Sequence, residues 1–179
     1  MHRNHLLALL KNYQPYDKDE RDMYEMLVRF VENESQCFER SLRIGHLTGS
    51  AWIVDRERRH VLLTHHRKLD RWLQLGGHAD GETDILAVAL REAREESGLE
   101  NIKPLLNTLF DVDVHSIPAR GDEPRHLHYD VRWLLEADSA APLVISNESK
   151  ELAWVALDDI GHLTTDRSIA RMTEKLRTN

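Results

Sequence analysis

The sequence predicts an α/β protein built on a mixed β-sheet. Short apolar runs typical of strands alternate along the chain with apolar residues at helical spacing. Hydrophobic residues make up 41% and charged residues 31% of the chain, which is the balance of an ordinary globular protein. The length of 179 residues suits one domain of moderate size with one appended element.

Residues 1–42 are predicted to form a helical N-terminal extension, which leaves residues 43–179 for the main domain. Two groups of apolar residues at helical spacing support this prediction: Leu6, Leu7, Leu9 and Leu10, followed by Met23, Met26, Leu27 and Phe30. The proline-containing residues 13–17 separate the two helices. Three roles stay open for the extension: packing on the main domain, forming the interface of a homodimer, or covering a substrate cleft.

The main domain begins with a predicted hairpin and continues with alternating strands and helices. The strands of the hairpin, residues 51–54 and 60–64, flank a charged turn. The later elements are predicted as a helix at 84–97, strands around 109–117 and 126–135, a strand at 152–156, and a helix at 165–177. This interleaving is why we expect a mixed sheet with helices packed against it.

The charge and the cysteine content exclude several classes of protein. The chain has 24 basic and 31 acidic residues and a net charge of −7, so its overall field does not favour nonspecific binding of nucleic acid. The single cysteine, Cys37, excludes an internal disulfide and a multi-cysteine zinc site. No tract approaches the roughly 20 apolar residues of a membrane-spanning helix. We therefore expect a soluble, cytoplasmic protein that binds neither membrane nor nucleic acid.

The predicted helix at 84–97 contains an unfavourable cluster of acidic residues. Glu92, Glu95 and Glu96 share one face near its C-terminal end, where each like-charged pair costs about 0.2–0.5 kcal/mol and the helix dipole disfavours each anion by about 0.3–1 kcal/mol. Such a local violation of the rules of stability is typical of a functional site. Three clustered carboxylates are hard oxygen ligands, which suit Mg²⁺ or Mn²⁺. A solvated charged helix face is the alternative interpretation.

The residues around this helix resemble the Nudix box, G-x5-E-x7-R-E-U-x-E-E-x-G-U, in which U is an apolar residue. The matching residues are Gly77, Arg91, Glu92, Ala93, Glu95, Glu96, Gly98 and Leu99. The first glutamate departs from the pattern, because Thr83 occupies its position and Glu82 lies one residue early. The resemblance to this MutT-like hydrolase family implies a Nudix-type α/β/α sandwich over residues 44–165, with a mixed sheet.

The resemblance also implies roles for individual residues. The implied ligands of Mg²⁺ or Mn²⁺ are the carbonyl of Gly76 and the side chains of Glu92, Glu95 and Glu96. The implied catalytic residues are Arg91, Glu92 and Glu148, and the implied structural residues of the box are Gly77, Glu82 and Gly98. Arg91 would hold the glutamates in place, with Glu82 as its expected partner. Glu148 is favoured over Glu151 as the later carboxylate that the family uses as a base or as a further metal ligand.

Two predicted strands bring polar residues to one face of the sheet. Strict alternation places Asp111, Asp113 and His115 on one face of the first strand, and His126, His128 and Asp130 on one face of the second. We expect this face to line a substrate cleft. The predicted substrate-binding residues are His78, which follows Gly77, and His115, His126 and His128. A solvated sheet face is the nearest alternative, and a zinc site formed by the His-x-His pattern ranks below both.

The resemblance implies metal-dependent hydrolysis of a phosphoanhydride bond in a nucleoside diphosphate derivative or a nucleoside triphosphate. A polyanionic phosphoanhydride repels hydroxide and carboxylate bases, and divalent metal would neutralise it and acidify the attacking water. A domain that senses a nucleotide without turnover is the first alternative, although it has less need of three clustered carboxylates. An isoprenoid-diphosphate isomerase ranks lowest, because Cys37 is far from the box in sequence.

Overall fold

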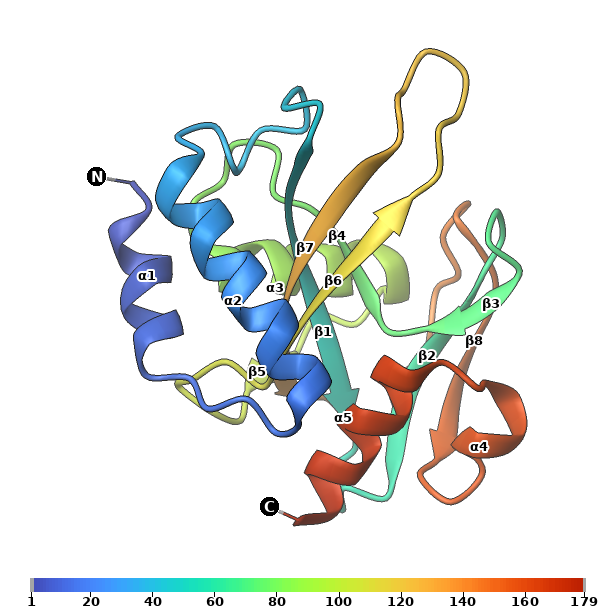
Figure 1. The fold of residues 1–179 in the computed structure, drawn as a ribbon. Coiled ribbons are helices and arrows are strands. Elements are labelled where there is room, and N and C mark those ends of the chain that lie inside the picture. The colour runs from blue at the N-terminus through green and yellow to red at the C-terminus, as the bar shows by residue number, and fades with distance from the viewer. Residues whose placement is uncertain (1, 179) are drawn as a thin grey trace.

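The computed structural model describes residues 2–178 of the chain (Figure 1). The helices are α1 (Asn4–Lys11), α2 (Lys18–Asn33), α3 (Ile85–Ser97), α4 (Ile160–Leu163) and α5 (Arg167–Thr178). The strands are β1 (Gly45–Val54), β2 (His60–His66), β3 (Arg71–Leu73), β4 (Leu75–His78), β5 (Lys103–Pro104), β6 (Asp111–Ile117), β7 (His126–Glu136) and β8 (Ser149–Ala156). None of the described helices is long and apolar enough to cross a membrane.

One mixed sheet contains all of these strands, and β1 lies at its centre. On one side β1 runs parallel to β7 along its whole length, from the pair Gly45–Leu127 to the pair Val54–Glu136. On the other side β1 pairs antiparallel with β4 in its middle and with β2 near its end. Strand β6 pairs antiparallel with β7, and β8 pairs antiparallel with β2. The predicted mixed sheet is therefore confirmed.

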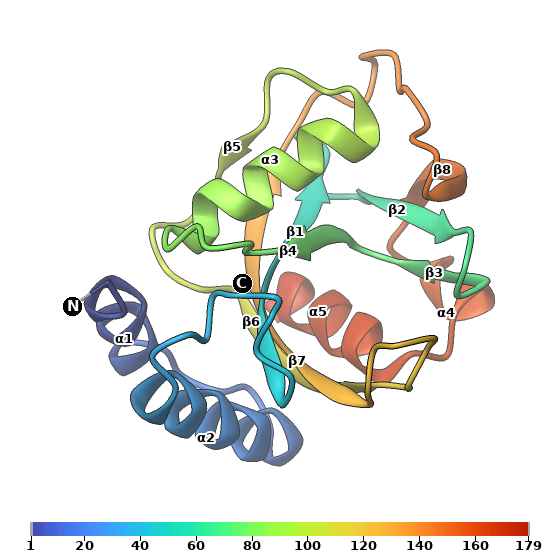
Figure 2. The same cartoon turned by 90° about the horizontal axis from the view of Figure 1, so that it is seen from above.

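Helices cover both faces of the sheet, which confirms the α/β/α sandwich. Figure 2 shows α3 on one side of the sheet and α5 on the other. The core under α3 includes Val88 and Ala89 of the helix and Leu47 and Ala51 of β1. The core under α5 includes Met172, and the side chains that surround it are Trp52, Val61, Leu63, Phe110, Leu134 and Ile169. Odd-numbered residues of β1 thus face α3, and even-numbered residues face α5.

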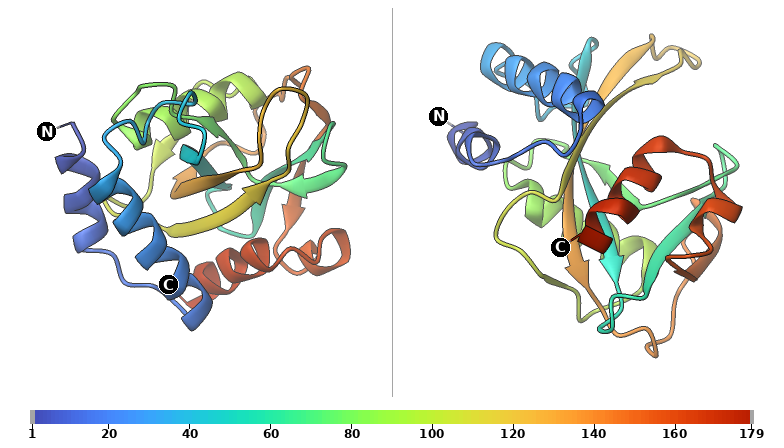
Figure 3. Two further views of the ribbon diagram at one scale, coloured as in Figure 1. Left: turned by 45° about the horizontal axis from the view of Figure 1, so that its top comes forward. Right: turned by 60° about the horizontal axis from the view of Figure 1, so that its bottom comes forward.

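The N-terminal extension packs on the main domain through α1 and α2, which lie side by side at the edge of the molecule (Figure 3). The rings of Phe30 and Tyr129 stack with their centroids 3.8 Å apart, and Leu27 and Val31 are fully buried. The extension therefore contributes side chains to the core of the main domain. Within the extension, Glu34 adopts an extended conformation that ends α2, so the residues from 34 to 42 lie outside its two helices.

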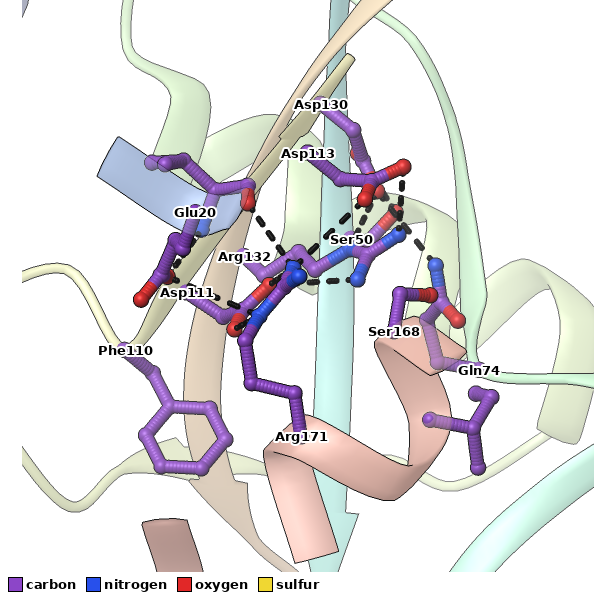
Figure 4. A network of polar contacts seen from close by, with 12 residues as sticks. Glu20, Ser50, Gln74, Phe110, Asp111, Asp113, Asp130, Arg132, Ser168 and Arg171 are labelled. Atoms are coloured by element: carbon purple, nitrogen blue, oxygen red, sulfur yellow. Dashed lines mark hydrogen bonds and ion pairs between the residues drawn. The ribbon is translucent and has the colours of Figure 1, made fainter. Parts of the chain in front are cut away.

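A buried network of ion pairs fastens α2, the sheet and α5 together (Figure 4). Asp111 of β6 accepts hydrogen bonds from Arg171 and Lys175 of α5 at 2.8 Å each, and from Arg132 of β7 at 3.1 Å. Lys175 also donates to the fully buried Glu20 of α2. Every charge in this group has an opposite charge beside it, which is the condition under which charged side chains are tolerated in a protein interior.

This network corrects the expectation that the carboxylates of β6 and β7 face a substrate cleft. Asp111, Asp113 and Asp130 are all buried. Asp130 accepts from Thr48 and Ser50 at 2.8 Å each, and its other oxygen accepts from Arg132 at 2.7 Å. The alternation along the strands is as predicted, but α5 supplies cations that cover this part of the face.

Candidate active site

The acidic helix α3 is held by caps at both ends and by one apolar face. The side chain of Asp84 accepts hydrogen bonds from the backbone N–H groups of Leu86 and Ala87, at 3.1 and 3.3 Å. Gly98 ends the helix in the left-handed conformation, with φ at 72°, which glycine adopts at little cost. Val88, Glu92 and Glu96 are spaced four residues apart and share one face, so the face that packs on β1 also presents these two glutamates to strand β4.

Strand β4 meets the acidic helix through two adjacent glycines. The backbone N–H of Gly76 donates to Oε1 of Glu96 at 3.3 Å. A Cβ atom on Gly77 would lie only 2.4 Å from the carboxyl carbon of Glu92. Only glycine therefore lets the Glu92 carboxylate lie against the backbone of this strand. The structure brings together Gly76, Gly77 and the predicted glutamates, although Glu95 is far more exposed (61%) than Glu92 (15%).

Burial and mutual repulsion perturb two of the glutamates. Burial, reinforced by the carboxylates of Glu92 and Glu148, raises the pKa of Glu96 to about 8, against the opposing hydrogen bond from Gly76. Burial also raises the pKa of Glu92, and the carboxylates of Glu95 and Glu148 add to this effect while Arg91 opposes it. Within residues 2–178, no lysine or arginine forms an ion pair with Glu96. The positive charge beside the cluster is thus too small to balance the negative charge of its carboxylates.

Arg91 joins the acidic helix to β4, but not in the way the sequence implied. Its guanidinium lies 2.7 Å from Oε1 of Glu92 and donates to the carbonyl of His78 at 3.0 Å. The expected ion pair with Glu82 is a wrong prediction. Glu82 lies in the loop before the helix and instead accepts hydrogen bonds from the backbone N–H groups of Thr83 and Asp84.

Glu148 approaches the acidic cluster from the segment that precedes β8. Its carboxylate is among the causes of the raised pKa values of both Glu92 and Glu96, whereas Glu151 is not. Arg67 fixes the backbone here: its N–H donates to the carbonyl of Glu148 at 2.7 Å, and its guanidinium donates to the carbonyls of Asn147 and Ser149, at 3.1 and 2.8 Å. The preference for Glu148 over Glu151 agrees with this placement.

A cluster of histidines lies on the face of the sheet that is opposite α3. The register pairs His128 with His46 and with His115, and it pairs His78 with Thr48, so these side chains share one face. The ring of His46 lies 5.0 Å from those of His78 and His126 and 4.9 Å from that of His128, between centroids. The structure therefore brings the four predicted substrate-binding histidines together and adds His46, which the sequence analysis missed.

Burial favours the neutral form of three rings of this cluster, those of His46, His78 and His128. Burial, reinforced by the neighbouring histidines, lowers the pKa of His128 to about 2. Burial is also the first cause of the fall in the pKa of His78, to about 4, to which Arg40 and His46 contribute. The pKa of His46 is lowered as well, by burial and by His126. A neutral imidazole has a lone pair on one ring nitrogen, which can accept a hydrogen bond or bind a metal.

The fold and the acidic cluster define the class of protein. It is an α/β/α sandwich enzyme in which the glutamates of one helix lie against a pair of glycines on a neighbouring strand. The sequence of residues 46–176 matches the family model of the NUDIX domain, and this range includes every residue of the predicted site. The chain belongs to the Nudix family and is an enzyme of the Nudix type. No curated protein matches the sequence.

Solved structures agree on the fold. The chain is similar to an Ap4A hydrolase of C. elegans in a binary complex, with a TM-score of 0.60, 17% identity, and coverage of 74% of this chain and 95% of that chain. It is also similar to a MutT Nudix hydrolase from Burkholderia pseudomallei, with a TM-score of 0.56, 25% identity, and coverage of 73% and 97%. The dihydroneopterin triphosphate pyrophosphohydrolase of E. coli has a TM-score of 0.56, 15% identity, and coverage of 72% and 92%.

Proposed function

We propose that this protein hydrolyses a phosphoanhydride bond in a nucleoside diphosphate derivative or a nucleoside triphosphate, and that the reaction requires Mg²⁺ or Mn²⁺. The observation that supports this most strongly is the surroundings of Glu96. Its carboxylate is partly buried and, among the described residues, accepts a single hydrogen bond, from Gly76, while the carboxylates of Glu92 and Glu148 lie near it. A divalent cation would turn their mutual repulsion into attraction.

The donor set fits a hard divalent ion. Carboxylate and carbonyl oxygens are the ligands that Mg²⁺ and Mn²⁺ prefer. The proposed ligands are the carbonyl of Gly76 and the side chains of Glu92, Glu95 and Glu96. When bound there, the ion would neutralise the phosphates of the substrate and acidify the attacking water.

The other residues of the site position these ligands or move a proton. Arg91 holds the Glu92 carboxylate beside β4, because the same guanidinium contacts Glu92 and the carbonyl of His78. Glu148 is the proposed base that accepts a proton from the attacking water, since its carboxylate lies close enough to Glu92 and Glu96 to raise the pKa of both. Arg67 is a positioning residue, because its three hydrogen bonds fix the backbone around Glu148.

The proposed substrate class also agrees with the structural neighbours. The structures named above belong to enzymes whose names specify Ap4A and dihydroneopterin triphosphate, both of which contain a polyphosphate. A chain of phosphates bound at the acidic helix would require a divalent counter-ion in every case. The histidine cluster supplies polar groups of a kind that can contact a phosphate or a base, and His115 exposes 44% of its side chain there.

Phosphate release from a panel of nucleotides with Mg²⁺ or Mn²⁺ tests the proposal. The wild-type protein should turn over at least one compound, and Glu96→Gln should lose about 10²-fold or more, the scale of a key electrostatic group in an active site. Glu100→Gln is the matched control, because Glu100 is exposed just beyond the end of the same helix. Saturable nucleotide binding without turnover, with either metal and for every compound, would contradict the proposed hydrolysis and favour a nucleotide sensor.

A further inference from the structure

We propose that His46, His78 and His128 form a second metal site, selective for a late transition metal such as Zn²⁺. The three side chains come from the strands β1, β4 and β7, and one nitrogen of each ring lies within 4.8 Å of the others. Strand β4 separates this site from the acidic cluster, because Gly77 faces α3 and the next residue, His78, faces the other way.

The backbone register places these rings together. His46 lies directly opposite His128 in the parallel pair of β1 and β7. His78 lies opposite Thr48, two residues along β1 from His46 and on the same face. Ligands on paired strands in the centre of a sheet need little ordering when an ion binds, which is the condition under which a metal site is tight.

The second observation is a lack of hydrogen bonds at buried nitrogens. His46 is 3% exposed, and neither of its ring nitrogens has a hydrogen-bond partner among the described residues. Nε2 of His128 is also buried without a partner. Leaving a buried polar nitrogen unsatisfied is costly, and native proteins rarely do so without a reason. An ion between the three rings would give one nitrogen of each ring a partner.

The chemistry of the donors selects the ion. Imidazole nitrogens suit Zn²⁺, Cu²⁺ and Ni²⁺, whereas the oxygens of the acidic cluster suit Mg²⁺ and Mn²⁺. In a tetrahedral zinc site with Zn–N bonds of 2.0–2.1 Å, ligand nitrogens are about 3.4 Å apart. The ring nitrogens therefore need to move toward one another by only a little over an ångström, which side-chain rotation can supply, to bind an ion between them.

Three protein ligands leave a fourth position, and the surroundings offer candidates for it. The ring of His126 lies 5.0 Å from that of His46, and the ring of His115 lies 5.5 Å from that of His128. Nδ1 of His115 contacts Asp113 at 2.9 Å, an arrangement that fixes the ring and leaves Nε2 free, as in many metal sites. With His78 and His128 as ligands, whichever of His115 and His126 does not take the fourth position remains for direct contact with a substrate.

Zinc titration of the full chain in the presence of excess Mg²⁺ tests the site, because Mg²⁺ occupies hard oxygen ligands and competes poorly for imidazoles. Calorimetry should detect one tightly bound Zn²⁺ per chain, and Co²⁺ in its place should give the strong visible absorption of a four-coordinate nitrogen site. His128→Gln and His78→Gln should each weaken zinc binding by about 100-fold or more, since even the loss of an outer partner costs about 10- to 100-fold.

Two controls separate this site from others on the chain. Glu96→Gln should bind Zn²⁺ as tightly as the wild type, and so should His162→Ala, which changes an exposed histidine of α4. Circular dichroism should show that His78→Gln and His128→Gln stay folded, because both residues are only partly buried. If the wild type fails to bind stoichiometric Zn²⁺ under excess Mg²⁺, or if Glu96→Gln abolishes binding that the histidine variants keep, the proposal is overturned. Neither result depends on phosphohydrolase activity.

Discussion

Replacing Gly77 by alanine should disable the acidic cluster without removing any of its charges. The added Cβ would lie 2.4 Å from the Glu92 carboxyl carbon, and ordinary contact begins at 3.4 Å, so the carboxylate must retreat by about 1 Å. A displacement of that size in a catalytic group costs about 10²-fold in rate, which is about 2.7 kcal/mol in the activation barrier. The kcat/KM for the best substrate should therefore fall by about two orders of magnitude.

The stability of the protein should change far less than its activity. The group that must move is the end of a flexible glutamate side chain, and Gly77 does not have a positive φ, so alanine fits its backbone. We expect the free energy of unfolding in urea to change by less than about 1 kcal/mol. Gly161→Ala is the matched control, because nothing lies within 4 Å of a Cβ at that position. Wild-type kcat/KM for Gly77→Ala would refute the placement of Glu92 at the reacting phosphates.

Two further predictions concern the buried network and the proposed base. Glu20→Gln should lower the free energy of unfolding by about 3–5 kcal/mol in urea denaturation, because it removes one partner of a buried ion pair. Glu25→Gln, at an exposed ion pair, should lower it by less than about 1 kcal/mol. Equal effects of the two substitutions would contradict the structural role of the network. Glu148→Gln should lower kcat by about 10²- to 10⁴-fold, the contribution of a general base, and Glu151→Gln should leave it nearly unchanged. Similar kcat values for both variants would argue against Glu148 as the base.

The sequence predicts those parts of the fold that have a local periodicity. The hairpin of β1 and β2, the helix α3, and the strands β6 and β7 are confirmed because each has enough residues to show its period. Strand β4 is not among the predicted strands. It has four residues, two of them glycine, and it is a strand only because β1 supplies its hydrogen bonds. Such an element depends on its partner, so its own residues do not predict it.

The same distinction separates the two candidate sites. The glutamates of α3 were predicted because residues three and four apart on a helix must share a face. His46 was missed because the first strand was expected to begin at residue 51, six residues after its actual start at Gly45. Outside a strand, a lone histidine has no predicted neighbours. Likewise, the alternation placed Asp111 on the correct face, but only tertiary structure brings Arg171 and Lys175 over it.

The distance between the acidic cluster and the sheet depends on glycines, which leave no side chain between the helix and the backbone of the strands. Gly49 of β1 and Gly77 of β4 are directly paired, and both face α3. A Cβ on Gly49 would lie 2.9 Å from the carbonyl oxygen of Ile85 and 3.0 Å from Val88, at the start of the helix. A Cβ on Gly77 would collide with Glu92, two turns further along. The two glycines therefore let one helix approach two strands along its length, and this close approach places Glu92 and Glu96 within reach of the β4 backbone.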